Sequence, residues 1–159
     1  MWIDLQRSDS SFAETSPFQL RNEAIISATP EQVFDAITMT MEEWFADIRG
    51  VEWTSPPPHA AGATRIVRLK ALSVKERFVN WEPGKRFTYA MDAISVPIVK
   101  QLMGDVHLSP SGQETRVEWV LHYRPSLLMR AVHPIARAIF GKMFRDSLTN
   151  LQRWITSKK

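Results

Sequence analysis

The stretch PIARAIFGKMFRDSLTNLQRWITS, residues 134–157, decides how the rest of the chain can fold. Its apolar residues recur at steps of three and four, which places them on one broad stripe of an α-helix. Pro134 suits the first turn of such a helix, where its missing N–H leaves no hydrogen bond unmade. The stripe consists of Ile135, Ile139, Phe140, Met143, Phe144, Leu148, Leu151, Trp154 and Ile155. A stripe this wide needs a large curved surface, so we expect one long helix gripped by a bent antiparallel sheet.

The composition excludes several classes of protein. The 159 residues suffice for one domain with a sizeable core, and 20 basic against 17 acidic side chains give a net charge of +3. This excess is too small, and the Lys and Arg residues too scattered, to indicate a nucleic-acid partner. The absence of cysteine excludes disulfides and thiolate chemistry. Because we find neither a secretory signal nor an apolar run of about 18 residues, we expect a cytoplasmic protein.

The part before the long helix is mostly β-structure. Residues 1–16 are polar and serine-rich and are predicted to form an N-terminal extension, with residues 17–159 as a single domain. Period-two alternation predicts about seven antiparallel strands, at residues 18–27, 51–54, 64–69, 73–81, 86–92, 106–108 and 115–123. Since most of these strands alternate, one face of the sheet should be buried against the helix and the other solvated. The fold class is therefore α+β.

Two short helices should follow the first strand. The sequence Thr29-Pro-Glu-Gln32 is a capping box, and Thr40-Met-Glu-Glu43 predicts a second helix that ends near Gly50. Residues 126–132 indicate a short helical lead-in, with a break at His133 because the residue before a proline disfavours the helical conformation. Residues 93–103 are apolar but follow neither period. They form either a lid over a cavity or a strand interrupted at Pro97.

Three motifs resemble the polyketide cyclase/dehydrase branch of the SRPBCC/START-like superfamily, which has the helix-grip fold. They are ATPEQVFDAI at residues 28–37, NWEPGKRFTY at residues 80–89 and GQETRVEW at residues 112–119. The resemblance covers roughly residues 18–157 and implies an apolar cavity between the sheet and the long helix. Members of this superfamily include lipid carriers, ligand receptors, chaperone activators and cyclases, so the resemblance implies a cavity and no particular reaction.

The cavity walls can be predicted from the strand phases and the helix stripe. Aromatic and methionine side chains fall on the candidate inward positions, and the apolar connection adds two more residues. The predicted lining is Trp81, Phe87, Tyr89, Met91, Trp119, Tyr123, Phe140, Met143, Ile98 and Met103. Such walls indicate that the protein binds a hydrophobic small molecule, such as a lipid, an isoprenoid or a polyketide-like ring system.

Ionisable residues on the middle strands leave the chemistry open. Glu76 and Arg77 are adjacent and cannot both point inward, so we expect a charge ladder on the outer face; the alternative is one inward Arg or Glu that fixes a ligand's polar end. A cyclase or dehydratase would need an inward acid or base, for which the candidates are Glu76, His107 and Tyr89. The absence of a recognisable catalytic motif favours binding over catalysis.

Other partners are limited by the same sequence. No two of the four histidines have metal-ligand spacing, and we expect neither a metal nor a cofactor. The basic side chains of the last helix permit at most transient contact with a membrane, since its apolar stripe is needed for the sheet. A protein-interaction module of the chaperone-activator type is a further alternative, and the chain is expected to be a monomer or a homodimer.

Overall fold

The computed structural model describes residues 1–158 and has the expected α+β helix-grip architecture. The strands are β1 (Ile3–Asp4), β2 (Phe18–Ile26), β3 (Ile48–Trp53), β4 (Thr64–Leu69), β5 (Ser73–Glu82), β6 (Arg86–Ile94), β7 (Val99–Ser111) and β8 (Glu114–Pro125). The helices are α1 (Phe12–Thr15), α2 (Pro30–Met39), the 3-10 turn η1 (Met41–Glu43), α3 (Leu127–Arg130) and α4 (His133–Ser157). The strands form one antiparallel sheet in the order β2-β8-β7-β6-β5-β4-β3, with β1 beside β6.

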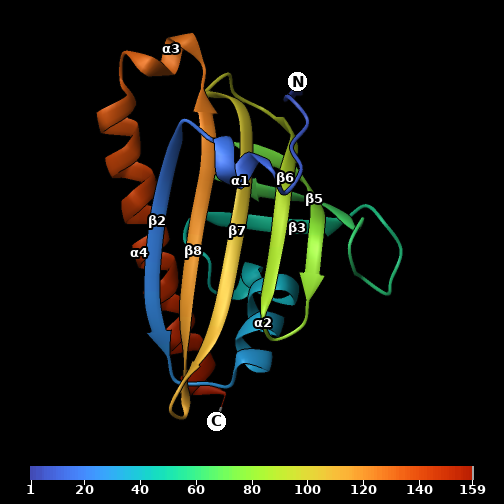
Figure 1. The fold of residues 1–159 in the computed structure, drawn as a ribbon, viewed down its shortest axis with the longest axis vertical. Helices are drawn as coiled ribbons and strands as arrows, with labels where there is room; N and C mark the ends of the chain where they lie inside the picture. The colour runs from blue at the N-terminus through green and yellow to red at the C-terminus, as the bar shows by residue number, and fades with distance from the viewer. Residues whose placement is uncertain (159) are drawn as a thin grey trace.

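Helix α4 runs along one face of the sheet, as the opening stretch predicts (Figure 1). Its buried side chains include Phe144, Leu148, Leu151 and Ile155, which all belong to the hydrophobic core. The predicted stripe was too wide, because Ile135 and Ile139 are 65% and 62% exposed. At 100° per residue these two isoleucines lie on the side of the helix opposite Phe144, so the same helix cannot bury both sets against one sheet.

The segment after β2 begins as predicted and then departs from the prediction. The Thr29 hydroxyl accepts from the Gln32 N–H at 3.2 Å, and Gln32 Oε1 accepts from the Thr29 N–H at 2.9 Å, so the first capping box is confirmed. The second helix is wrong, because only η1 forms and the chain re-enters the sheet at Ile48. Thr40 is the C-cap of α2, with its hydroxyl donating to the Ala36 carbonyl at 3.1 Å, and its side chain caps no new helix.

The apolar connection at residues 93–103 is an interrupted strand and not a long lid. Strand β6 continues to Ile94 and β7 starts at Val99, so only residues 95–98 lie between them. Further along, Gly104 faces Tyr89 directly across the two strands. A Cβ atom at Gly104 would lie 2.1 Å from Tyr89 Cζ, so the glycine lets the tyrosine ring lie flat across the inner face of the sheet.

The N-terminal residues lie on the outer face of the sheet, opposite α4 (Figure 1). Strand β1 pairs with the end of β6, and Phe12 of α1 is 4% exposed. The Ser16 hydroxyl is 2.9 Å from His122 Nδ1, and the Gln101 amide donates to the Arg7 carbonyl at 3.2 Å. The outer face is therefore covered by residues 1–16 toward the end of the sheet where β6 and β7 connect, which corrects the expectation of a solvated face.

Candidate functional site

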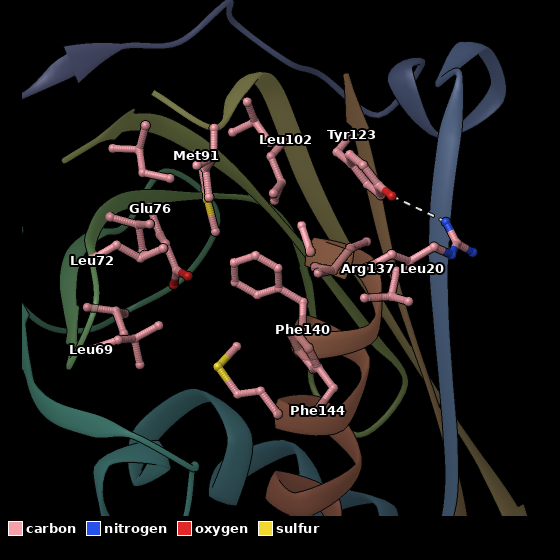
Figure 2. A pocket seen from close by; sticks show the side chains of 18 of the residues that line it. Leu20, Leu69, Leu72, Glu76, Met91, Leu102, Tyr123, Arg137, Phe140 and Phe144 are labelled. Atoms are coloured by element: carbon pink, nitrogen blue, oxygen red, sulfur yellow. Dashed lines mark hydrogen bonds between the residues drawn. The ribbon is translucent and has the colours of Figure 1, made fainter. Parts of the chain in front are cut away.

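A partly open cavity of about 110 Å³ lies between the inner face of the sheet, α3 and the first half of α4. Its walls are almost entirely apolar, and Figure 2 shows Met91, Leu102, Phe140 and Phe144 around it. The lining is completed by Leu20, Met41, Phe45, Val67, Leu69, Leu72, Val74, Glu76, Tyr89, Ile94, Ile98, Val99, Trp119, Leu121, Tyr123, Met129, His133, Ala136, Arg137 and Met143. Polar groups are few, and most lie at two separate places, which we call the inner end and the mouth.

At the inner end, a buried ion pair joins β4 to β5. Arg65 Nε donates to Glu76 Oε1 at 2.8 Å, and the two side chains are 2% and 6% exposed. Arg65 Nη1 also donates to the Thr38 carbonyl at 2.9 Å, and its guanidinium carbon lies 5.3 Å from the centre of the Trp53 ring. Two of the three guanidinium nitrogens, Nε and Nη1, are therefore held, and the Glu76 carboxylate forms part of the cavity wall.

Tyr89 supplies the hydroxyl in the middle of the cavity. Trp119 Nε1 donates to the Tyr89 hydroxyl at 3.1 Å, which fixes the orientation of both rings. Burial, with the nearby negative charge of Glu76, raises the pKa of Tyr89 above its ordinary value of about 10. Tyr89 therefore stays protonated and can act as a hydrogen-bond donor, not as a base.

At the mouth, three polar side chains converge. Arg137 Nη1 donates to the Tyr123 hydroxyl at 3.2 Å, shown as the dashed line in Figure 2, and the same oxygen is 2.6 Å from His133 Nε2. Arginine can only donate, so the Tyr123 oxygen accepts from Arg137; whether Tyr123 donates to His133 Nε2 or accepts from it is set by the imidazole tautomer. The Phe18 ring packs edge-on against His133 at 4.5 Å between centroids and holds it in place.

The ten residues predicted to line a cavity separate into two groups. Seven do line it: Tyr89, Met91, Ile98, Trp119, Tyr123, Phe140 and Met143. Trp81 and Phe87 do not, because they pack edge-on against Phe34 of α2 and fill the core below the cavity. Met103 does not either, because it lies opposite Ala90 and His122 on the outer face of the sheet.

The predicted acid/base candidates are also divided. Glu76 and Tyr89 line the cavity, whereas His107 lies on the outer face, half exposed and 3.1 Å from Asp105, so it cannot act there. The expected outer charge ladder is wrong for Glu76, which points inward with Arg65. The expectation of an outward charge is correct for Arg77, whose Nε donates to Asp92 at 3.2 Å on the outer face.

The sequence analysis did not predict the polar side chains at the mouth of the cavity. The sequence predicts only a break in the helix at His133, and it predicts no role in the cavity for Arg137, one of the basic side chains of the last helix. A signal did exist, since Arg137 lies seven residues before Phe144 and so falls on the buried side of α4. The break itself lies one residue earlier than predicted, since His133 is the first residue of α4 and residues 131–132 form the turn.

Two further structural observations concern the described part of the chain. Within residues 1–158, no group of three or more His, Asp or Glu side chains is placed so that it could hold a metal ion. None of the helices in that range is both long enough and apolar enough to cross a lipid bilayer.

The family of the protein follows from comparison of its sequence with known families. Residues 17–155 match the family described as polyketide cyclase/dehydrase and lipid transport, so the chain belongs to this family. The chain is also 30% identical over 156 residues to the uncharacterized protein Rv2574 of Mycobacterium tuberculosis, an alignment that covers 96% of this chain and 93% of the relative.

Solved structures share the fold at low sequence identity. A Thermus thermophilus protein superposes with a TM-score of 0.74 at 15% identity, over 89% of this chain and 99% of that one. The major latex-like protein 151 of Panax ginseng superposes with a TM-score of 0.71 at 14% identity, over 86% and 95% of the two chains. At these identities the likeness establishes the helix-grip fold and carries no residue role.

Proposed function

We propose that this protein binds a hydrophobic small molecule, such as a lipid, an isoprenoid or a polyketide-like ring system, in the cavity under α4. The observation that carries the proposal is the cavity itself: nearly continuous apolar walls with few polar groups, placed mostly at its two ends. A site of this kind gains affinity from its walls and orientation from its few polar groups. The family description, which includes lipid transport, supports the same class of ligand.

The volume of the cavity limits how a ligand is bound. At about 110 Å³ it is smaller than the roughly 300–1,000 Å³ of a typical small-molecule pocket. A ligand larger than about one ring must therefore displace part of the wall. Met91, Met129 and Met143 are suited to this, because an unbranched thioether side chain can adopt many shapes at little cost.

The enzymatic alternative is a cyclase or dehydratase that uses Glu76. It is favoured by one observation, a carboxylate in the cavity wall. Against it, Glu76 is already hydrogen-bonded to Arg65, and Tyr89 is kept protonated by burial. Turnover of a polyketide-like substrate that is lost in Glu76→Gln, with binding retained, would decide for catalysis.

We also propose that ligand exchange involves transient contact with an anionic membrane. Five large aliphatic side chains lie exposed on α3, the turn that follows it and the start of α4, beside the mouth: Leu127, Leu128, Val132, Ile135 and Ile139. Residues 119–145 contain five Lys or Arg and no Asp or Glu, a charge that suits anionic lipid. Dimerisation through this surface, or docking of a partner protein as in an interaction module, would appear as a change in light scattering without lipid.

The primary test uses a neutral fluorescent probe, N-phenyl-1-naphthylamine. Binding to the wild type should raise its fluorescence, and Met91→Trp should abolish that signal by filling the cavity. Ile25→Trp, at a 47% exposed position on β2 outside the cavity, is the matched control and should bind the probe normally. Thermal unfolding of both variants checks that they fold. Equal probe binding by wild type and Met91→Trp would contradict the proposal.

Two further experiments use the unmodified protein. Native mass spectrometry of the purified protein tests whether a ligand is retained, and cell fractionation tests the proposed cytoplasmic location.

A further inference from the structure

We infer that the ligand of this cavity is an amphiphile with an acidic head group, a carboxylate or a phosphate monoester, recognised at the mouth by Arg137 and His133. The inference rests on the proposed function, since it specifies the ligand of the same cavity. It adds the charge of the ligand's polar end, the end of the cavity at which that group lies, and the side chains that contact it.

Arg137 has hydrogen-bonding capacity that the protein does not use. Of its five N–H donors, one is directed at the Tyr123 hydroxyl. No ion pair within residues 1–158 involves Arg137, whereas Arg77 and Arg86 are each paired with an aspartate. A planar guanidinium with free donors at the rim of an apolar cavity is suited to bind a carboxylate or phosphate through two hydrogen bonds.

The neighbouring groups add a second donor and hold it in place. In the tautomer with its hydrogen on Nδ1, His133 accepts the Tyr123 hydrogen at Nε2, 2.6 Å from the hydroxyl oxygen, and Nδ1 is a second donor. Phe18 packs against both the Tyr123 and His133 rings, with centroid distances of 5.8 and 4.5 Å. In that tautomer the mouth carries donors on two side chains, arranged before a ligand arrives, which lowers the entropic cost of binding.

The charge distribution fixes the sign and the orientation of the ligand. The chain around the mouth, residues 119–145, has no acidic side chain, and the positive end of the α4 dipole lies at His133. At the other end of the cavity stands the Glu76 carboxylate, and Figure 2 shows Glu76 and Arg137 on opposite sides of the pocket. An anionic group would be repelled by Glu76 and attracted by Arg137, so the apolar tail points inward and the acid outward.

The expected preference is moderate, because Arg137 is exposed to water. Solvent and salt screen a charge pair at such a site, so we expect an acid to bind about tenfold more tightly than the matching alcohol, not several hundredfold. The same screening predicts that the preference declines as ionic strength rises. A purely apolar selection by the cavity walls would show neither the preference nor its salt dependence.

The test is displacement of N-phenyl-1-naphthylamine from the wild type by decanoate, decyl phosphate and decanol, with Arg137→Gln and the exposed helix residue Arg145→Gln as variants. We expect an advantage of about tenfold for decanoate or decyl phosphate over decanol in wild type and Arg145→Gln, and an advantage below about twofold in Arg137→Gln. The comparison of decanoate with decyl phosphate identifies which acid is preferred. Affinity for the neutral probe should be the same in wild type and Arg145→Gln; in Arg137→Gln, which alters the cavity lining, the measure is the ratio of acid to alcohol competition, which a general change in probe affinity does not affect.

Two results would overturn the inference separately from the proposed function. If the probe binds but decanol competes as well as both acids, the cavity is apolar and the acidic head group is wrong. If the acids are preferred equally in Arg137→Gln, Arg137 is not the recognition residue. Failure of the probe to bind wild type at all would overturn the proposed function, and this inference with it.

Discussion

Arg65 and Glu76 lie opposite each other on β4 and β5 and form an ion pair with an N–O distance of 2.8 Å inside the apolar core. Both belong to the inner face of the sheet, where neighbouring positions carry Trp53 and Phe78. Transfer of two charges out of water costs several kcal/mol per ion, which their mutual attraction and the extra bond to Thr38 must offset. Removing one partner of this ion pair should therefore change the free energy of unfolding much more than replacing both partners.

We expect Glu76→Ala to lower the free energy of unfolding by about 3–5 kcal/mol, because it leaves Arg65 charged and buried without a counter-ion. The double variant Arg65→Met, Glu76→Leu should regain most of this loss, since it removes both charges and keeps apolar volume. Urea unfolding of the wild type, the single variant and the double variant measures these differences in the free energy of unfolding. A single variant within about 1 kcal/mol of wild type would mean that Arg65 reaches water.

The two sides of α4 give a second test of stability. Leu151 is fully buried, so Leu151→Ala should lower the free energy of unfolding by about 2–5 kcal/mol. Ile135→Ala removes a similar side chain that is 65% exposed and should change it by less than about 0.5 kcal/mol. Equal effects in thermal and urea unfolding would show that both faces of the helix are packed.

The architecture could be predicted from local signals. The period of the apolar residues distinguishes strand from helix, and the capping box at Thr29 fixes where α2 begins. The second predicted capping box, at Thr40, shows the limit: the same residue types can also end a helix, and here Thr40 is the C-cap of α2, while Trp44 and Phe45 are buried in the core.

The cavity was less predictable because its lining depends on the register between strands. Glu76 is two residues from the inward Phe78 and so shares its face, but a lone buried carboxylate is too costly to expect. Only the register between β4 and β5, which the alternation pattern does not specify, brings Arg65 beside it. Met103 was misplaced for a similar reason, since the cover that buries the outer face comes from residues 1–16.

His122 provides a prediction about pH on the outer face. Burial, only partly offset by the Asp105 carboxylate, lowers the pKa of His122 below 6.5, and the Arg21 guanidinium lowers it further. The unfolded chain then binds the proton first as the pH falls, so the contribution of His122 to stability is complete above about pH 6.5 and is lost as the pH falls toward the lower pKa of the folded state.

Urea unfolding between pH 7.5 and 5.5, on the order of one pH unit either side of the histidine's ordinary value, checks this expectation. The wild type should lose stability over that interval more steeply than His122→Gln, whose amide can still hydrogen-bond the Ser16 hydroxyl that now lies 2.9 Å from the ring. Parallel curves for the two proteins would show that His122 does not titrate differently on folding.

The exposed surface on α3 and α4 leads to the last prediction, which concerns membranes. Ile135 and Ile139 point away from the sheet, and full burial of an isoleucine side chain in an apolar phase contributes roughly 1.5–3 kcal/mol. Ile135→Ser with Ile139→Ser should therefore weaken binding to phosphatidylglycerol-containing vesicles by at least about tenfold, as measured by co-sedimentation. Ile25→Ser is the control, because it removes an isoleucine that is 47% exposed on the far side of β2. Added salt should weaken binding of the wild type, since the attraction between the basic residues 119–145 and the lipid is screened. If the control loses as much binding as the double variant, or if vesicles without phosphatidylglycerol bind equally well, contact with the membrane does not occur through this surface.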